Sequence, residues 1–172
     1  MNKVEVFENE LVYIENEDIR DSLRTMIEKI PDYFFTIPAA STGKYHPQYA
    51  QGEGGLVRHT KAAVRMAYEL YGIYKFPQRT KDLIIMALVL HDSVKKGEEE
   101  SKYTLFDHPL IAGEFIKKYK DVADEFFMME ELSGILRNRR KKRGSIDFDI
   151  PEAKVILDDN GEVKELLCSY IP

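Results

Sequence analysis

Residues 83–97 read LIIMALVLHDSVKKG, and this stretch decides how the chain folds. Its first eight residues are all apolar, which predicts a helix buried on every side at the centre of an all-α domain. The run ends in the adjacent pair His91 and Asp92, whose side chains are costly to bury without partners. A metal ion would satisfy both of them, so the same stretch indicates a site as well as a core.

The chain has the composition of one globular domain. It has 172 residues, of which 44% are hydrophobic and 32% charged. A domain of this length buries enough surface to be stable without disulfide bonds. The single cysteine, Cys168, excludes an intrachain disulfide, fits a reducing cytosol and is read as a small apolar residue. The acidic N-terminal residues do not form a signal peptide, and no apolar run reaches the roughly 20 residues of a membrane span. We therefore expect a cytoplasmic protein without membrane contact.

The charge is unevenly distributed along the chain. A formal net charge of -5 argues against a general affinity for nucleic acid. However, six of the seven residues 137–143 are basic, among them Arg139 and Arg140. An arginine side chain can donate hydrogen bonds to two phosphate oxygens at once, so these two residues are candidate substrate-binding residues. A solvated helix end explains the same basic run equally well.

The apolar periodicity predicts one domain, residues 1–172, with a helical core at about 18–140. Apolar side chains recur at helical spacing in residues 18–30, 55–74, 78–92, 108–119 and 122–138. Residues 32–55, with two prolines and four glycines, predict a long functional loop. Alternating patterns predict small β-hairpins in residues 1–17 and 145–172. Phenylalanines and methionines in 125–132 would pack internally or against a second copy, so a homodimer stays open.

Two of the four histidines stand in buried positions of the predicted helices. His59 lies on the apolar face of its helix, and His91 ends the central helix. Either one alone is best explained as a core histidine with satisfied hydrogen bonds. Together with Asp92 they form a nitrogen and oxygen ligand set that suits a borderline or hard divalent cation.

These residues resemble those of the HD-domain metal-dependent phosphohydrolases. The first motif is GGLVRHT, which contains His59, and the second is LVLHDSVKKG, which contains His91 and Asp92. The order PAA, YH, GGL, HT in residues 38–60 is similar to exoribonuclease-associated HD domains and to phage and mobile-element relatives. YTLFDHPLIAGEFI is similar to the segment that follows the doublet in the phage-type proteins. The resemblance extends from about Phe34 to Ile116.

The resemblance implies an HD-type helical bundle whose histidines and aspartate bind a divalent metal ion, one of Mn, Ni, Fe, Mg or Zn. Asp92, Lys95 and His108 are then the candidate catalytic residues. Lys95, one helical turn after Asp92, would approach a phosphate, or else be a solvated surface lysine. His46 lies between Tyr45 and Tyr49, where it would contact substrate or help to tether the loop.

The chain departs from the family pattern near its C-terminal residues. Ser169 stands where phage-type relatives carry the last metal-binding aspartate. Asp159 is a weak candidate for that ligand, since it lies in the predicted turn, where Asp often has a structural role. The histidine-glycine segment expected after His108 is also absent.

Two functions therefore remain open. The preferred one is a phosphohydrolase that acts on a nucleotide or nucleic-acid phosphoester through a metal-activated water. The alternative is a catalytically lapsed HD domain that binds a nucleotide or nucleic acid, so enzyme activity is expected rather than established by the sequence.

Overall fold

A computed structural model describes residues 1–40, 46–119, 153–160 and 163–168. This part of the chain is mostly helical, as the sequence predicts. Its elements, in chain order, are α1 (Lys3–Val6), α2 (Glu8–Leu11), α3 (Glu17–Lys29), η1 (Asp32–Phe35), η2 (Gln48–Ala50), α4 (Gly55–Leu70), α5 (Gln78–Leu90), α6 (His108–Lys118), β1 (Ala153–Leu157) and β2 (Val163–Cys168). No helix in the described ranges is long and apolar enough to cross a membrane.

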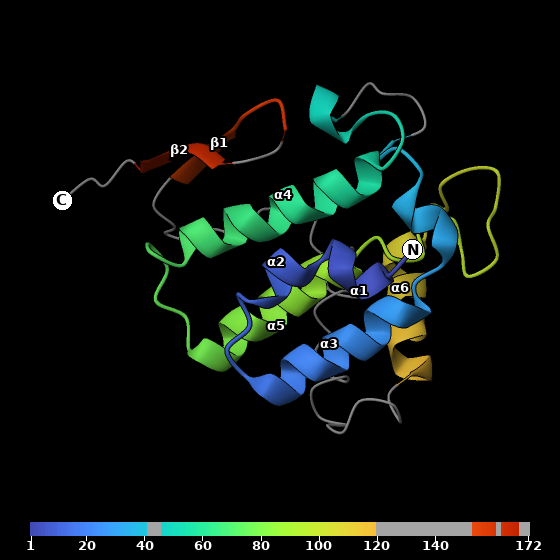
Figure 1. Ribbon diagram of the computed structural model, residues 1–172, viewed down its shortest axis with the longest axis horizontal. Helices are drawn as coiled ribbons and strands as arrows, with labels where there is room; N and C mark the ends of the chain where they lie inside the picture. Colours follow the sequence, from blue (N-terminus) through green and yellow to red (C-terminus); the bar gives the residue numbers. More distant parts are fainter. Residues whose placement is uncertain (41–45, 120–152, 161–162, 169–172) are drawn as a thin grey trace.

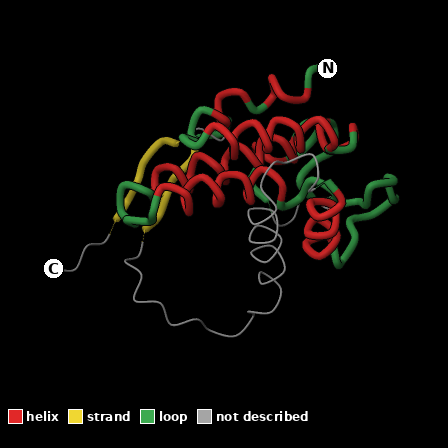
Figure 2. Tube along the Cα trace, turned by 90° about the horizontal axis from the view of Figure 1, so that it is seen from below, coloured by secondary structure: helices red, strands yellow, loops and turns green. Residues whose placement is uncertain are grey.

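Three helices form the centre of the fold, and α5 lies among them. α5 contacts α4 on one side and α3 on the other. α4 and α5 run in opposite directions (Figure 1), so the start of α4 and the end of α5 lie at the same end of the bundle. The two strands and α6 lie toward opposite ends of the fold (Figure 2).

Local signals in the sequence fix the ends of these helices. The Asn16 side chain caps α3 by accepting a hydrogen bond from the Ile19 amide at 2.9 Å, and Pro31 follows the helix. α4 begins after Gly54, whose φ of 67° favours glycine. At Gly55 a Cβ atom would lie 2.2 Å from the carbonyl oxygen of Ala50, so the loop can approach the helix only at glycine. The glycine pair therefore fixes where α4 starts.

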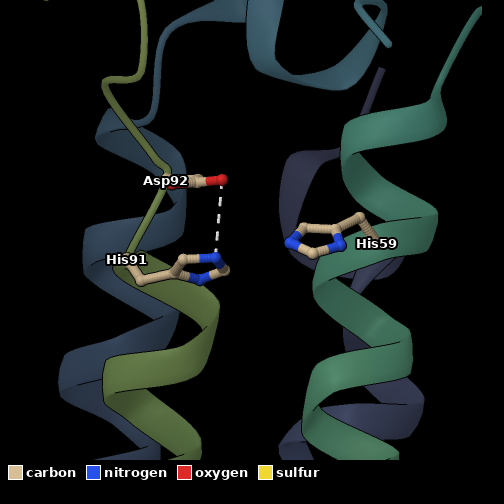
Figure 3. A group of neighbouring side chains, drawn as sticks. All are labelled: His59, His91 and Asp92. Carbon is tan, nitrogen blue, oxygen red and sulfur yellow. Dashed lines mark ion pairs between the residues drawn. The ribbon is translucent and has the colours of Figure 1, made fainter. Parts of the chain in front are cut away.

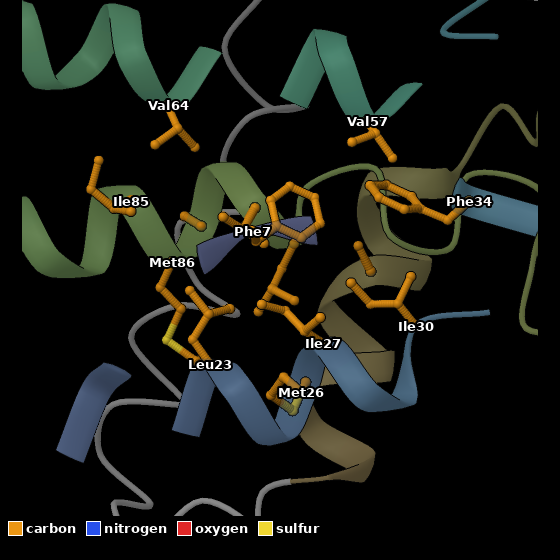
Figure 4. Packing of buried hydrophobic residues seen from close by; sticks show 14 of the residues in the cluster. Phe7, Leu23, Met26, Ile27, Ile30, Phe34, Val57, Val64, Ile85 and Met86 are labelled. Carbon is orange, nitrogen blue, oxygen red and sulfur yellow. The ribbon is translucent and has the colours of Figure 1, made fainter. Parts of the chain in front are cut away.

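The core is one contiguous cluster of buried apolar side chains between these helices. Figure 4 shows Leu23 of α3 and Met86 of α5 close together, with Val64 of α4 above them. The apolar run of residues 83–90 is buried at Leu83, Ile85, Met86, Ala87, Val89 and Leu90. The prediction of a central buried helix is therefore confirmed.

The predicted N-terminal hairpin is wrong, because residues 3–11 form the short helices α1 and α2. Phe7, Leu11 and Ile14 are completely buried. They are spaced four and three residues apart, which is the spacing of a helical face. The alternation of Val4, Val6, Leu11 and Tyr13 suggested strands only because it left out Phe7. Packing against α3 and α4 decides the conformation.

The loop before α4 and the segment near the C-terminus complete the described fold. Residues 32–55 contain the short 3-10 helices η1 and η2, and η2 packs against α4. β1 and β2 pair antiparallel, with Ala153 opposite Cys168 and an irregularity at Ile156/Leu157, and both contact α4. The helix predicted at 122–138, the basic residues Arg139 and Arg140, and Ser169 lie outside the described residues.

Candidate metal centre

Antiparallel packing of α4 and α5 brings His59 and His91 together. His59 lies in the second turn of α4, and His91 is the C-cap residue of α5. Their ring centroids are 5.7 Å apart. One ligand atom from each of His59, His91 and Asp92 lies within 4.8 Å of the others (Figure 3), so the predicted trio converges.

The tautomer of His91 is fixed by a backbone carbonyl. Its Nδ1 atom lies 2.6 Å from the carbonyl oxygen of Leu88, which can only accept, so Nδ1 carries the proton. A neutral His91 then has its lone pair on Nε2, which lies 3.5 Å from Oδ2 of Asp92. That lone pair is the one suited to bind a metal.

His108 approaches the same carboxylate from α6. Its Nδ1 lies 2.8 Å from the carbonyl oxygen of Leu105, and its Nε2 lies 3.2 Å from Oδ1 of Asp92. Neutral His108 therefore presents a second lone pair to Asp92. Only a shared proton or a metal cation makes this contact attractive.

Asp92 is the centre of the cluster and is only 4% exposed. Burial by itself would raise the pKa of its carboxyl group, but His91 and His108, when their imidazoles are protonated, and the ammonium of Lys95 outweigh burial and hold this pKa well below its usual range. Oδ1 accepts no hydrogen bond from the described part of the chain. An ionised carboxylate with an unsatisfied oxygen beside two imidazoles fits a divalent cation.

Lys95 is buried, so the alternative of a solvated surface lysine is wrong. Its side chain is about as buried as that of Asp92, with 7% of the residue exposed. Nζ donates to Oδ2 of Asp92 at 2.9 Å and to the carbonyl oxygen of Ala39 at 2.8 Å. Lys95 therefore orients the carboxylate and ties it to the loop before α4.

His46 joins the cluster from the loop. Its ring lies 4.7 Å from that of His59 at an angle of 83°. Burial and the charge of Lys95 lower the pKa of His46. Burial and the charge of His91 lower the pKa of His59 to about 4. For His46 and His59 the neutral imidazole, the form that a metal requires, is therefore favoured at neutral pH.

Asp159 does not belong to this group of ligand atoms. It is exposed in the turn after β1, and the neighbouring Asp158 accepts a hydrogen bond from the Asn160 amide at 2.9 Å. That is an ordinary turn contact of an Asp side chain. Within the described residues, the ligand group consists of His59, His91 and Asp92.

The sequence does not reveal several groups that hold the cluster. The carbonyl oxygens of Ala39, Leu88 and Leu105 belong to the backbone and carry no sequence signal. Tyr33 of η1 was also missed. Its hydroxyl donates to the carbonyl oxygen of Gly97 at 2.6 Å and accepts from the Lys96 amide at 3.0 Å, which holds the turn after Asp92.

Comparison with known proteins finds only partial similarity. No family model and no solved structure match the chain. It is 50% identical over 46 residues to ribonuclease R of Aquifex aeolicus, 38% over 74 residues to ribonuclease R 1 of Lactococcus lactis, and 35% over 79 residues to ribonuclease R of Thermotoga maritima. These segments are 27, 42 and 45% of this chain, and 6, 9 and 11% of the three relatives.

Proposed function

We propose that this chain is an HD-type metal-dependent phosphohydrolase that acts on a nucleotide or nucleic-acid phosphoester. The observation that carries the proposal is the surroundings of Asp92. A buried carboxylate faces the Nε2 atoms of His91 and His108, and its Oδ1 accepts no hydrogen bond from the described residues. A metal cation among these groups would satisfy the carboxylate and both imidazoles at once.

His59, His91 and Asp92 would hold the cation. A bound divalent cation lowers the pKa of a water molecule from 15.7 to about 7 and offsets charge on a phosphoryl oxygen. Two neutral imidazoles and one carboxylate leave a net positive centre, which an anionic phosphoester would favour. His46 lies beside His59 and His108 lies beside Asp92, and in this proposal these two residues would contact the phosphate.

Lys95 has a positioning role in this proposal. Its hydrogen bonds to Asp92 and Ala39 fix the carboxylate that the cation needs. A direct contact between Lys95 and phosphate stays a prediction. Phosphate contacts by Arg139 and Arg140 likewise stay predictions.

The partial relatives suggest which substrates to test first. They are ribonucleases, so short RNA oligonucleotides are tested first, followed by nucleotides and phosphomonoesters. The similarity spans less than half of this chain. RNA is therefore a substrate to test, and the chemistry of the proposal rests on the histidine and aspartate cluster.

A non-catalytic binding module is a second candidate, and one observation favours it. The ammonium of Lys95 already balances the charge of Asp92 at 2.9 Å. If this pair is permanent, Asp92 has no unbalanced charge to attract a divalent cation, and any phosphate would be bound without a metal. The two candidates therefore differ in whether the protein needs a divalent cation.

The experiment measures hydrolysis of RNA, nucleotides and phosphomonoesters with Mn²⁺, Ni²⁺, Fe²⁺, Mg²⁺ or Zn²⁺. Asp92→Asn removes the central charge while keeping the size of the side chain. Asp18→Asn, in the exposed first turn of α3, is the matched control. We expect metal-dependent turnover that Asp92→Asn abolishes and Asp18→Asn retains. Phosphate binding that is unaffected by chelation, without turnover of any substrate, would favour the binding module.

A further inference from the structure

A cavity lies at the end of the bundle opposite to the histidine cluster. It has a volume of about 390 Å³, which is within the range of small-ligand sites. Its walls come from the loop between α2 and α3, the C-terminal end of α4 and the N-terminal end of α5. Figure 1 shows these three segments together at one end of the bundle.

Tyrosine rings form the walls of this cavity. Tyr13 stacks on Tyr68 with centroids 4.1 Å apart and planes 16° from parallel. Tyr68 and Tyr71 meet at 70°, with centroids 6.4 Å apart. The two rings meet edge to face and form a corner, in which a cation would contact the π face of one ring. Tyr68 is 46% exposed, so this corner is accessible to solvent.

The charges around the cavity favour a positive ligand. Glu15 and Glu69 line it together with one lysine, Lys81. Within the described residues, neither glutamate forms an ion pair. Glu69 lies in the last turn of α4, which has no basic side chain. The lining therefore has more negative than positive charge.

Lys81 shows that a cation can lie against these rings. Its Nζ atom lies 5.6 Å from the centroid of Tyr71. The Tyr71 hydroxyl also donates to the carbonyl oxygen of Lys81 at 2.8 Å, which holds the ring in place. The ammonium of Lys81 lies against Tyr71, while Tyr68, which stacks on Tyr13 and is 46% exposed, remains accessible to a second positive group.

We propose that the cavity lined by Tyr13, Tyr68, Tyr71, Glu15 and Glu69 binds an organic cation, a guanidinium or an alkylammonium group. The source of that group is either a small free molecule or the side chain of an arginine or lysine in a protein. The cavity does not involve the histidine cluster, so the proposal is independent of the proposed hydrolase activity.

The test compares two ligands of nearly the same shape that differ in charge. Butylguanidine is cationic and butylurea is neutral, and both are titrated into chelator-treated full-length protein while tyrosine ring signals are recorded by NMR. We expect butylguanidine to shift the rings of Tyr13, Tyr68 and Tyr71 and butylurea to leave them unchanged. Equal shifts with both ligands, or none with either, would overturn the proposal.

Variants that change the charge of the cavity lining are expected to weaken or to tighten the binding of the cation. Glu69→Gln is expected to weaken butylguanidine binding about tenfold, as loss of one carboxylate beside a partly desolvated cation predicts. Lys81→Gln removes the competing ammonium and is expected to tighten binding. Glu99→Gln, an exposed change of the same charge elsewhere, is the control and is expected to have no effect. If all three variants bind as the parent does, the cavity is not a cation site.

A second titration identifies the source of the cation. A short end-blocked peptide with one arginine is compared with butylguanidine under the same conditions. Tighter binding of the peptide indicates a protein partner, and equal or weaker binding indicates a free small cation. Failure of both ligands to bind would contradict the proposal whatever the outcome of the hydrolase assays.

Discussion

The ammonium of Lys95 donates a hydrogen bond of 2.9 Å to the carboxylate of Asp92, three residues earlier in the chain. Both side chains are buried. Replacing Lys95 by Met leaves Asp92 as a buried carboxylate without its cation, so we expect a loss of stability of about 3 kcal/mol in metal-free protein. A divalent metal would replace the lost charge, so adding it should raise the melting temperature more in the variant than in the parent.

The neighbouring lysine provides the control for this change. Lys96 pairs with Glu100 at the surface, and Lys96→Met should cost about 1 kcal/mol or less. If added metal raises the melting temperature of Lys95→Met no more than that of the parent protein, the metal does not bind at Asp92 in place of Lys95.

Tyr33 holds the turn that follows Asp92. Tyr33→Phe removes only the hydroxyl, which leaves the Lys96 amide and the carbonyl oxygen of Gly97 without this partner. We expect a loss of about 1–3 kcal/mol in the free energy of unfolding, measured by urea denaturation. Tyr103→Phe, at a ring that is 65% exposed, should be neutral. Equal stability of the two variants would show that the buried hydroxyl does not hold the turn.

Gly55 determines how closely η2 approaches α4. In Gly55→Ala the new Cβ would overlap the carbonyl oxygen of Ala50, so the loop or the first turn of α4 must move. We expect destabilisation of at least about 2 kcal/mol and weaker metal binding, because His59 follows one turn later. Gly72→Ala, whose Cβ meets only an ordinary contact at 3.4 Å, is the control. A stable Gly55→Ala variant with unchanged metal affinity would refute this account of the loop.

The partial burial of His59 predicts how stability depends on pH. The pKa of His59 is lowered by burial and by His91 to about 4 in the folded protein, against about 6.5 in an unfolded chain. Below pH 6.5 the unfolded state takes up the proton first, which would cost about 2.5 kcal/mol between pH 6.5 and 4 for the full shift. His59 is only partly buried, which reduces this cost, so metal-free protein should lose about 1–2 kcal/mol. His59→Gln should show less of this loss in thermal melts at a series of pH values. An identical pH profile for the variant would mean that another group causes the loss.

Much of the fold follows from the sequence because helix signals are local. Asn16, Pro31 and the pair Gly54 and Gly55 mark helix ends, and the apolar run at 83–90 marks the buried helix. The convergence of His59 with His91 also follows, once two antiparallel helices are assumed. These features depend on spacing and on short-range contacts, which a sequence displays directly.

The remaining features depend on tertiary contacts. Residues 1–17 alternate weakly, and only packing against α3 and α4 selects helices there. The burial of Lys95 depends on the carbonyl oxygen of Ala39, 56 residues earlier, which no motif encodes. The corner of Tyr13, Tyr68 and Tyr71 likewise joins a loop to a helix end that is remote in sequence.

The most direct test of the central claim is pulsed electron paramagnetic resonance of the protein with bound Mn²⁺. We predict modulation from two histidine nitrogens in the parent protein, from one nitrogen in His59→Gln and in His91→Gln, and loss of tight Mn²⁺ binding in Asp92→Asn. Nitrogen modulation that does not change in either histidine variant, or its absence from the parent protein, would contradict a metal centre at His59, His91 and Asp92.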